Sequence, residues 1–177
     1  MIFLVRHGEA AASWGEHDDP GLSDTGRDQA ERAALELMAL GAHQSVTSPM
    51  RRCRETAEAF EDLAGLSSRV ENAVSEIKTP DGVADRVSWL REVMAGDWPA
   101  DLADWRSRAF DAIANLPDGT AVFSHFVAIN AIVGSLTSDP RVLVFKPGHC
   151  SVTQLRRGAD SKLSVEAMGS EAVTRVL

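Results

Sequence analysis

The chain of 177 residues contains little cysteine and no long apolar run. Its two cysteines, Cys53 and Cys150, lie far apart and form no metal-binding spacing, which favours a reduced, cytoplasmic setting. Only five apolar residues precede Arg6, too few for a signal peptide, and no apolar run approaches the ~20 residues that span a membrane. We therefore expect no membrane partner.

Positively charged residues are also few, with 18 lysines and arginines compared with 26 aspartates and glutamates, which gives a net charge of −8. Bulk electrostatics therefore argues against a nucleic-acid partner, although a local group of arginines could attract an anionic substrate into one pocket. The composition, 44% hydrophobic and 25% charged, is typical of a globular protein. The length predicts a single domain over residues 1–177.

Apolar runs and turn residues predict alternating strands and helices. Asp24 or Thr25 is expected to cap the first helix and Ser48 the second, with Pro49 at its first position. The order of elements predicts an α/β protein, a three-layer α/β/α sandwich with a mostly parallel central sheet. We expect strands at 1–6, 45–47, 69–74, 120–124, 151–157 and 163–167, the last two as an antiparallel hairpin, and helices at 24–40, 49–64, 82–95, 99–116 and 126–137.

Two apolar runs end in a histidine. Ile2–Val5 leads into Arg6-His7-Gly8, and Ala121–Phe123 leads into Ser124-His125. If the two strands are parallel neighbours, both imidazoles emerge at the carboxyl edge of one sheet, where open α/β folds place their ligands. The glycine permits close backbone approach to a ligand, and the adjacent guanidinium suits a phosphate group. This pattern predicts an anion site.

A group of arginines opens the helix expected at 49–64. Arg51 and Arg54 each have an acid four residues later, Glu55 and Glu58, with which they can pair on the helix surface. Arg52 has no such acid and borders the apolar face of the helix. We therefore expect Arg52 to point inward, at a helix amino terminus that already favours anions.

These motifs resemble, in the right order, those of the histidine phosphatase superfamily, the phosphoglycerate mutase-like proteins. The Arg-His-Gly triplet is its signature, and the resemblance covers residues 1 to about 135. It implies the phosphoglycerate mutase-like form of the α/β/α sandwich. The matching segments are Leu4–Glu9, Leu22–Gly26 with Gln29-Ala30, Ser48–Arg52 with Thr56-Ala57, Ser75-Glu76-Ile77 and Phe123-Ser124-His125.

The resemblance also implies roles for five residues. His7 would be the nucleophile that forms a phosphohistidine, while Arg6, Arg52 and His125 would bind the phosphoryl oxygens and Glu76 would protonate the leaving oxygen. Such cationic groups can stabilise phosphoryl transfer without a metal, so no metal ligand and no cofactor are expected. The nucleophile must be neutral and His125 helps most when cationic, so we expect their acidities to differ.

Several positions leave alternatives open. Glu71 and Asp81 compete with Glu76 for the role of the acid. Phe126 stands where many relatives have glycine and would change the pocket wall. His149, just before a late strand, is a weaker candidate for the pocket. The remaining histidines, His17 and His43, are expected at the surface.

A short segment around 78–118, with Trp89, Trp98 and Trp105 interpreted as core residues, is expected to form a small helical cover. A small cover suits a phosphatase better than a mutase, because a mutase must exclude water while its substrate reorients in the site. The favoured function is a metal-independent phosphomonoesterase acting on a small phosphorylated metabolite. The alternatives are a phosphoglycerate mutase, a protein phosphohistidine phosphatase and a non-catalytic phosphate-binding module.

Overall fold

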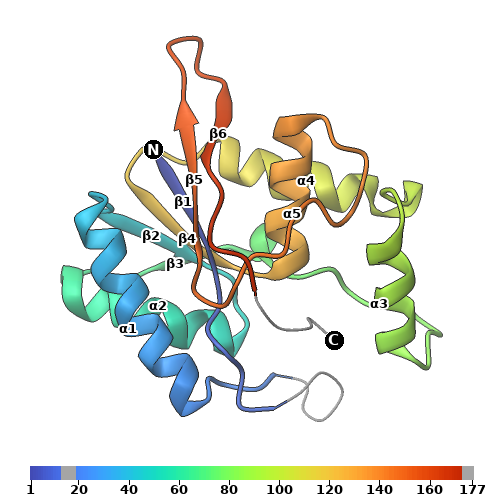
Figure 1. Cartoon of the computed structure of the whole chain (residues 1–177), viewed down its shortest axis with the longest axis horizontal. Coiled ribbons are helices and arrows are strands. Elements are labelled where there is room, and N and C mark those ends of the chain that lie inside the picture. The colour runs from blue at the N-terminus through green and yellow to red at the C-terminus, as the bar shows by residue number, and fades with distance from the viewer. Residues whose placement is uncertain (13–18, 173–177) are drawn as a thin grey trace.

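In the computed structural model, which describes residues 1–12 and 19–172, the described chain forms a six-stranded mixed sheet between two layers of helices (Figure 1). The expected surface position of His17 lies outside the described residues. The strand order is β3-β2-β4-β1-β5-β6. The strands are β1 (Ile2–Arg6), β2 (Gln44–Thr47), β3 (Arg69–Val70), β4 (Thr120–Ser124), β5 (Val152–Arg157) and β6 (Leu163–Ala167).

The central strands are parallel. β1 pairs with β4 in a register that places Leu4 opposite Val122 and Arg6 opposite Ser124, and β2 lies parallel to both β4 and β3. β5 runs antiparallel to β1 and forms an antiparallel hairpin with β6. The predicted α/β sandwich and its late hairpin are therefore confirmed, and β1 and β4 end at the same edge of the sheet.

Helices cover both faces of this sheet (Figure 1). α1 (Asp24–Ala39) and α2 (Arg51–Ala64) lie on one face, and α4 (Ala103–Ala114) and α5 (Phe126–Thr137) lie on the other. α3 (Arg86–Ala95) stands at the side of the second layer, and the short 3-10 turns η1 (Asn72–Val74) and η2 (Ala100–Leu102) both contact α4. None of the helices in the described part of the chain is long and apolar enough to cross a membrane.

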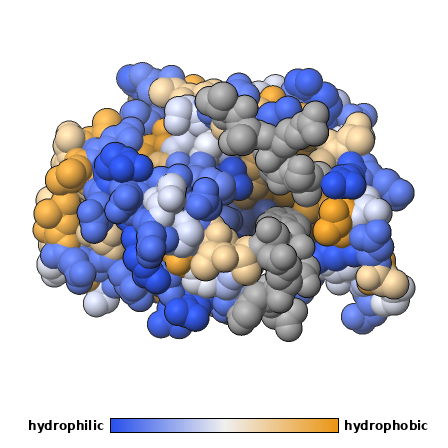
Figure 2. All heavy atoms as spheres, turned by 60° about the horizontal axis from the view of Figure 1, so that its bottom comes forward, coloured by the Kyte–Doolittle hydropathy of each residue, from blue (hydrophilic) through white to orange (hydrophobic). Residues whose placement is uncertain are grey.

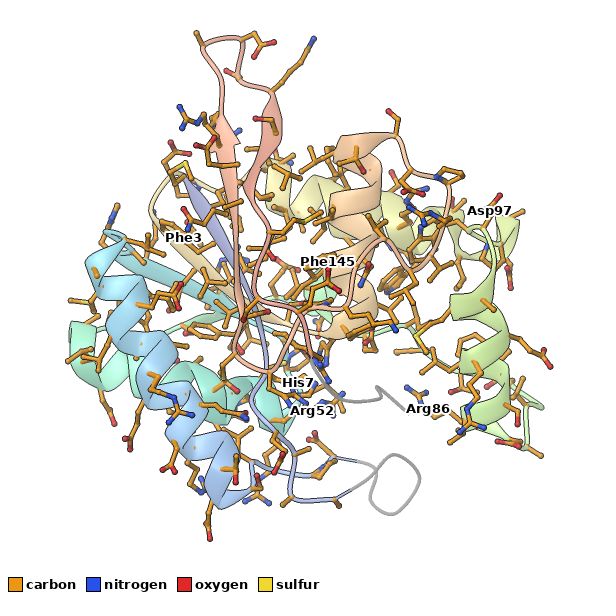
Figure 3. The ribbon with its side chains drawn as sticks, in the orientation of Figure 1. Phe3, His7, Arg52, Arg86, Asp97 and Phe145 are labelled. Atoms are coloured by element: carbon orange, nitrogen blue, oxygen red, sulfur yellow. The ribbon has the colours of Figure 1, made fainter. Side chains whose placement is uncertain are left out.

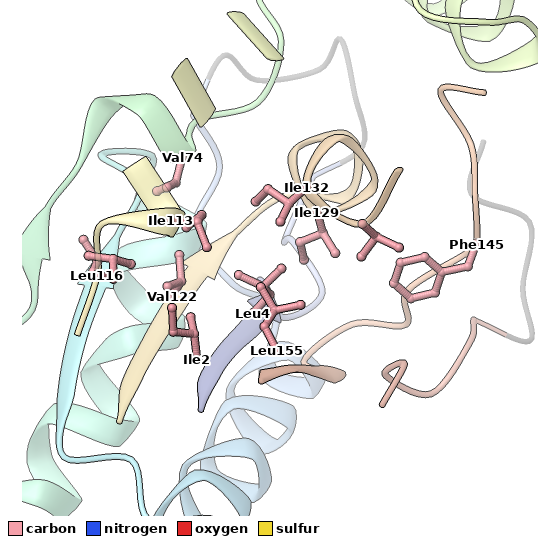
Figure 4. Close-up of a cluster of buried hydrophobic side chains, with 12 residues drawn as sticks. Ile2, Leu4, Val74, Ile113, Leu116, Val122, Ile129, Ile132, Phe145 and Leu155 are labelled. Carbon is pink, nitrogen blue, oxygen red and sulfur yellow. The ribbon is translucent and has the colours of Figure 1, made fainter. Parts of the chain in front are cut away.

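The alternation of side chains along β1 explains its unbroken apolar sequence. Phe3 and Val5 pack against the layer of α1 and α2, while Ile2 and Leu4 pack into the opposite cluster, shown in Figure 4. All four side chains are buried, with at most 1% of their surface exposed. A strand buried on both faces must be apolar throughout, and each such side chain stabilises the fold by roughly 1.5–3 kcal/mol.

Two helix starts differ from expectation. Ser23, rather than Asp24 or Thr25, caps α1, because its Oγ accepts a hydrogen bond from the backbone N–H of Gly26 at 3.0 Å. The expected cap Ser48 lies outside α2.

α2 has Met50 at its N-cap position, and Met50 makes no side-chain capping bond. The N–H of Arg51 is instead satisfied by Asp19 Oδ1 at 2.8 Å, an acid more than thirty residues earlier in the chain. The hydroxyl of Ser48 accepts a hydrogen bond from the backbone N–H of Met50 at 3.4 Å and also contacts His125, in the site described below.

The expected strand at 69–74 is also shorter than predicted. Pairing with β2 ends at Val70, and the side chain of Glu71 accepts a hydrogen bond from the N–H of Ala73, which turns the chain into η1. Similarly, α3 begins at Arg86 because Asp85 caps it, with Oδ1 accepting from Ser88 N at 3.0 Å.

Candidate functional site

The two histidines that follow β1 and β4 lie side by side at the carboxyl edge of the sheet. The N–H of His7 donates to the carbonyl of Ser124 at 3.0 Å, and the ring centroids of His7 and His125 are 5.3 Å apart. Figure 3 shows His7 at this end of β1, next to Arg52. The face that carries this edge is hollowed near its middle, with hydrophilic residues along the border of the hollow (Figure 2).

His7 is held in one tautomer by its own turn. Its Nδ1–H donates to the carbonyl oxygen of Gly8 at 2.8 Å, so the lone pair is on Nε2. A side chain at Gly8 is excluded, because a Cβ there would lie 2.6 Å from the carbonyl oxygen of Gly26. Burial lowers the pKa of His7 well below its usual value, and the nearby His125 and Arg52 lower it further. The imidazole is therefore neutral, with Nε2 available as a nucleophile.

Arg52 connects the two histidines. It is the second residue of α2 and only 7% exposed. Its Nε donates to His7 Nε2 at 3.2 Å and its Nη2 donates to His125 Nδ1 at 3.1 Å. Arg51 lies outside, where its Nε donates to Glu55 at 2.6 Å. The inward position of Arg52 thus agrees with the i, i+4 spacing of its neighbours.

His125 is completely buried between polar groups. Because its Nδ1 accepts from Arg52, its Nε2–H donates to Ser48 Oγ at 2.8 Å, and the thiol of Cys53 lies 3.3 Å from the same nitrogen. Burial lowers the pKa of His125 well below its usual value, and the adjacent Arg52 and Arg6 add to the effect. Burial and the arginines therefore shift the pKa values of His7 and His125 in the same direction, and both rings are neutral, although a cationic His125 would bind a phosphoryl group more strongly.

Arg6, the last residue of β1, is held on three sides. Its Nη1 donates to the carbonyl of Pro147 at 2.9 Å, its Nη2 donates to His149 Nε2 at 2.9 Å, and its Cζ lies 5.2 Å from the ring centroid of Phe126. Its Nε is buried and has no partner among the described residues. Burial lowers the pKa of Arg6 to about 10, so the guanidinium remains charged at neutral pH.

Glu76 is buried at the amino terminus of α5. Its Oε2 accepts from Val127 N at 3.0 Å, and its Oε1 accepts from Ala128 N and Ile77 N, both at 3.2 Å. Burial raises the pKa of this carboxyl above its usual value, although the three N–H groups and Arg52 act in the opposite direction. A carboxylate has about four lone pairs, so one remains, on Oε2.

The two rival acids lie in different surroundings. Glu71 forms an ion pair with Arg69 at 2.8 Å, and this hydrogen-bonded partner lowers the pKa of its carboxyl. Asp81 is exposed. Of the three candidates, Glu76 alone is buried, and its charge acts on the guanidinium of Arg6.

His149 is the residue that sequence reasoning underrated. Its ring centroid lies 6.0 Å from that of His7, which makes it a third imidazole at the site. The sequence did contain a signal for His149. An antiparallel strand next to β1 begins at the edge of the sheet where β1 ends, and His149 lies just before the strand β5, which runs in this way. His43, in contrast, is exposed, as expected.

The segment after Glu76 borders the site through aromatic residues. Trp89, Trp98 and Trp105 are partly buried and pack against an apolar cluster that includes Ile77 and Phe126. Trp98 and Trp105 stack with ring centroids 5.9 Å apart. Arg86, at the start of α3, lies between that helix and the site in Figure 3, and its positive charge lowers the pKa of His125.

Within residues 1–12 and 19–172, no group of three or more histidine, cysteine, aspartate or glutamate side chains could hold a metal ion. What the site offers is a neutral imidazole nitrogen surrounded by two buried guanidinium groups, a second imidazole and a buried carboxyl group. Such an arrangement can bind an anion and attack it.

Comparison with known proteins agrees with this geometry. The family model of the histidine phosphatase superfamily (branch 1) matches residues 2–168. The chain belongs to this superfamily. A similar curated protein is the probable phosphoglycerate mutase GpmB of Erwinia tasmaniensis, 25% identical over 163 residues, which cover 79% of this chain and 76% of the relative.

Solved structures show the same fold. A mycobacterial glucosyl-3-phosphoglycerate phosphatase superimposes with a TM-score of 0.78 at 22% identity, covering 97% of this chain and 99% of that one. A phosphoserine phosphatase from Entamoeba histolytica, in complex with 3-phosphoglyceric acid, gives a TM-score of 0.76 at 16% identity and covers 96% of both chains.

Proposed function

We propose that this protein is a phosphomonoesterase that hydrolyses a small phosphate ester through a phosphohistidine on His7. The observation that carries the proposal is the contact between His7 Nε2 and Arg52 Nε at 3.2 Å. It places a neutral nucleophile directly beside a buried cation, which is the pairing that attack on a phosphoryl group requires. The membership of the histidine phosphatase superfamily supports the same reaction class.

In the first step, the Nε2 lone pair of His7 forms a bond to phosphorus while the bond from phosphorus to the ester oxygen breaks. The proton on Glu76 passes to that oxygen, which leaves as an alcohol. The ring then carries positive charge, and its Nδ1–H bond to the Gly8 carbonyl stabilises that charge. Arg6 and Arg52 bind the equatorial oxygens, where negative charge is spread in the transition state.

In the second step, the carboxylate of Glu76 takes a proton from water as the water oxygen attacks phosphorus. The bond from nitrogen to phosphorus breaks, and its electron pair returns to Nε2 of His7. Orthophosphate leaves and the neutral imidazole is restored. The same carboxyl group thus serves as acid and then as base, and its buried position favours the protonated form needed at the start.

The substrate class that we propose is a small phosphorylated metabolite. Two solved structures with this fold carry the names of phosphatases of such compounds, glucosyl-3-phosphoglycerate and phosphoserine. No metal takes part in the proposed reaction, because the guanidinium groups already supply the cationic field. A second candidate is phosphoglycerate mutase activity, favoured by the names of the curated relatives that cover most of the chain.

A screen of phosphorylated metabolites with the purified protein tests the proposal. Free orthophosphate and isomerised phosphate ester are measured in the same samples, with the His7→Ala variant as the control for contaminating enzymes. The phosphatase proposal predicts orthophosphate as the main product from at least one ester, and none from the variant. Isomerisation without hydrolysis would favour the mutase, and orthophosphate release by the variant at the wild-type rate would overturn both.

A further inference from the structure

Three contacts hold the guanidinium of Arg6 in one orientation, although an arginine that attracts a phosphate through its charge alone would need no fixed orientation. The Pro147 carbonyl holds Nη1, the His149 ring holds Nη2, and the Phe126 ring lies against the guanidinium carbon. Arg6 is only 8% exposed, yet its Nε has no hydrogen-bond partner among the described residues. A buried N–H without a partner is costly, which indicates that this donor is kept for a ligand.

We propose that His149 is a positioning residue for Arg6, whose Nε2 holds the guanidinium so that the unpaired Nε–H faces the phosphoryl group. This role rests on the proposed function of the site. It deepens that function, because it assigns a task to the third imidazole. Arginine has a rigid fork of donors on a flexible stem, so a group that fixes the fork reduces the entropy lost when an anion binds.

The charge state of His149 suits this task. Burial lowers the pKa of His149 to about 4, and Arg6 acts in the same direction while Glu9 opposes it. The ring is therefore neutral at ordinary pH, and because Nε2 accepts the Arg6 bond, the proton lies on Nδ1. The ring of His7 also lies beside that of His149, and it too is neutral. A neutral acceptor orients the guanidinium without competing with it for the anion.

Substitutions of His149 by side chains of different length test its contact with Arg6. Inorganic phosphate is the probe, and its affinity is measured by calorimetric titration. His149→Leu removes the acceptor. His149→Gln keeps a carbonyl oxygen at about the distance of Nε2, whereas the shorter His149→Asn does not reach Nη2. We expect the leucine and asparagine variants to weaken phosphate binding about tenfold and the glutamine variant to stay within about threefold of wild type, the range of coupling found for contacting residues.

A double substitution shows whether His149 acts through Arg6. In the Arg6→Lys background the fork is gone, so His149→Leu should weaken phosphate binding less than about twofold further. His43→Leu, at an exposed position, is the control and should leave binding unchanged. A full tenfold loss in the Arg6→Lys background, or wild-type affinity in both His149→Leu and His149→Asn, would overturn the inference. If the wild-type protein binds no phosphate, both this inference and the proposed function fail.

Discussion

The Nε atom of Arg52 lies 3.2 Å from the Nε2 atom of His7, although the two residues are 45 positions apart in the sequence. The contact has two consequences. The positive charge of Arg52 helps to lower the pKa of His7, which keeps the nucleophile unprotonated. It also places a donor where a phosphoryl oxygen would arrive, so the guanidinium exchanges its bond to nitrogen for a charge-assisted bond to the substrate.

Arg52→Ala should lower kcat/KM by on the order of 10²-fold or more, a few kcal/mol of transition-state stabilisation. Arg54→Ala, an exposed arginine two positions along the same helix, is the matched control and should stay near wild type. Steady-state kinetics on one phosphate ester compares the two. A larger loss in the Arg54 variant would show that the inward-facing arginine is not the one that matters.

Glu76→Gln should slow hydrolysis of an alkyl phosphate far more than hydrolysis of p-nitrophenyl phosphate. An alkoxide needs a proton in order to leave, whereas nitrophenolate hardly does. The raised pKa of Glu76 also predicts that activity falls as the pH rises through that pKa, and the variant should lose this alkaline limb. Both substrates are measured across pH, with Glu71→Gln as the control. Equal losses on both substrates would make Glu76 a structural residue.

The folded protein should lose stability as the pH falls below about 6.5, the usual histidine pKa. Burial lowers the pKa values of His7 and His125 in the folded state, so the unfolded chain binds protons that the folded chain does not. Glu76 acts oppositely at lower pH, because its raised pKa favours folding as its carboxyl is protonated. Thermal unfolding from neutral pH downward measures the effect, and His125→Gln should reduce its slope.

Activity should survive dialysis against a metal chelator. The proposed mechanism draws its positive charge from the guanidinium groups of Arg6 and Arg52, both of which are buried at the site. The rate of phosphate release is measured before and after dialysis, and again after adding back divalent ions. A loss that magnesium, manganese or zinc restores would contradict the mechanism.

Local sequence was sufficient to predict the frame of the site. The unbroken apolar runs of β1 and β4 indicated strands buried on both faces, and parallel neighbours of this kind deliver His7 and His125 to one edge. The lack of an acid four residues after Arg52 indicated its inward direction. The character of each strand and the inward face of α2 are set by residues close together in the sequence, which is why these predictions held.

Features that depend on distant partners were missed. The N–H of Arg51 at the start of α2 is satisfied by Asp19, in a different part of the chain, and Ser48 accepts a hydrogen bond from His125. The neutral state of His125 depends on how deeply the ring is buried and then on how closely the arginines approach it, neither of which a sequence pattern contains. The place of His149 depends on β5 running antiparallel beside β1.

The central claim is that His7 carries the phosphoryl group. Wild-type protein is mixed with a labelled phosphate ester, quenched in base within milliseconds to seconds, and digested for peptide mapping. We predict label on the peptide that contains His7, stable to base and lost in acid, and no label in the His7→Ala variant. Label on Cys53 or on a serine, or steady turnover by His7→Ala at the wild-type rate, would contradict the account.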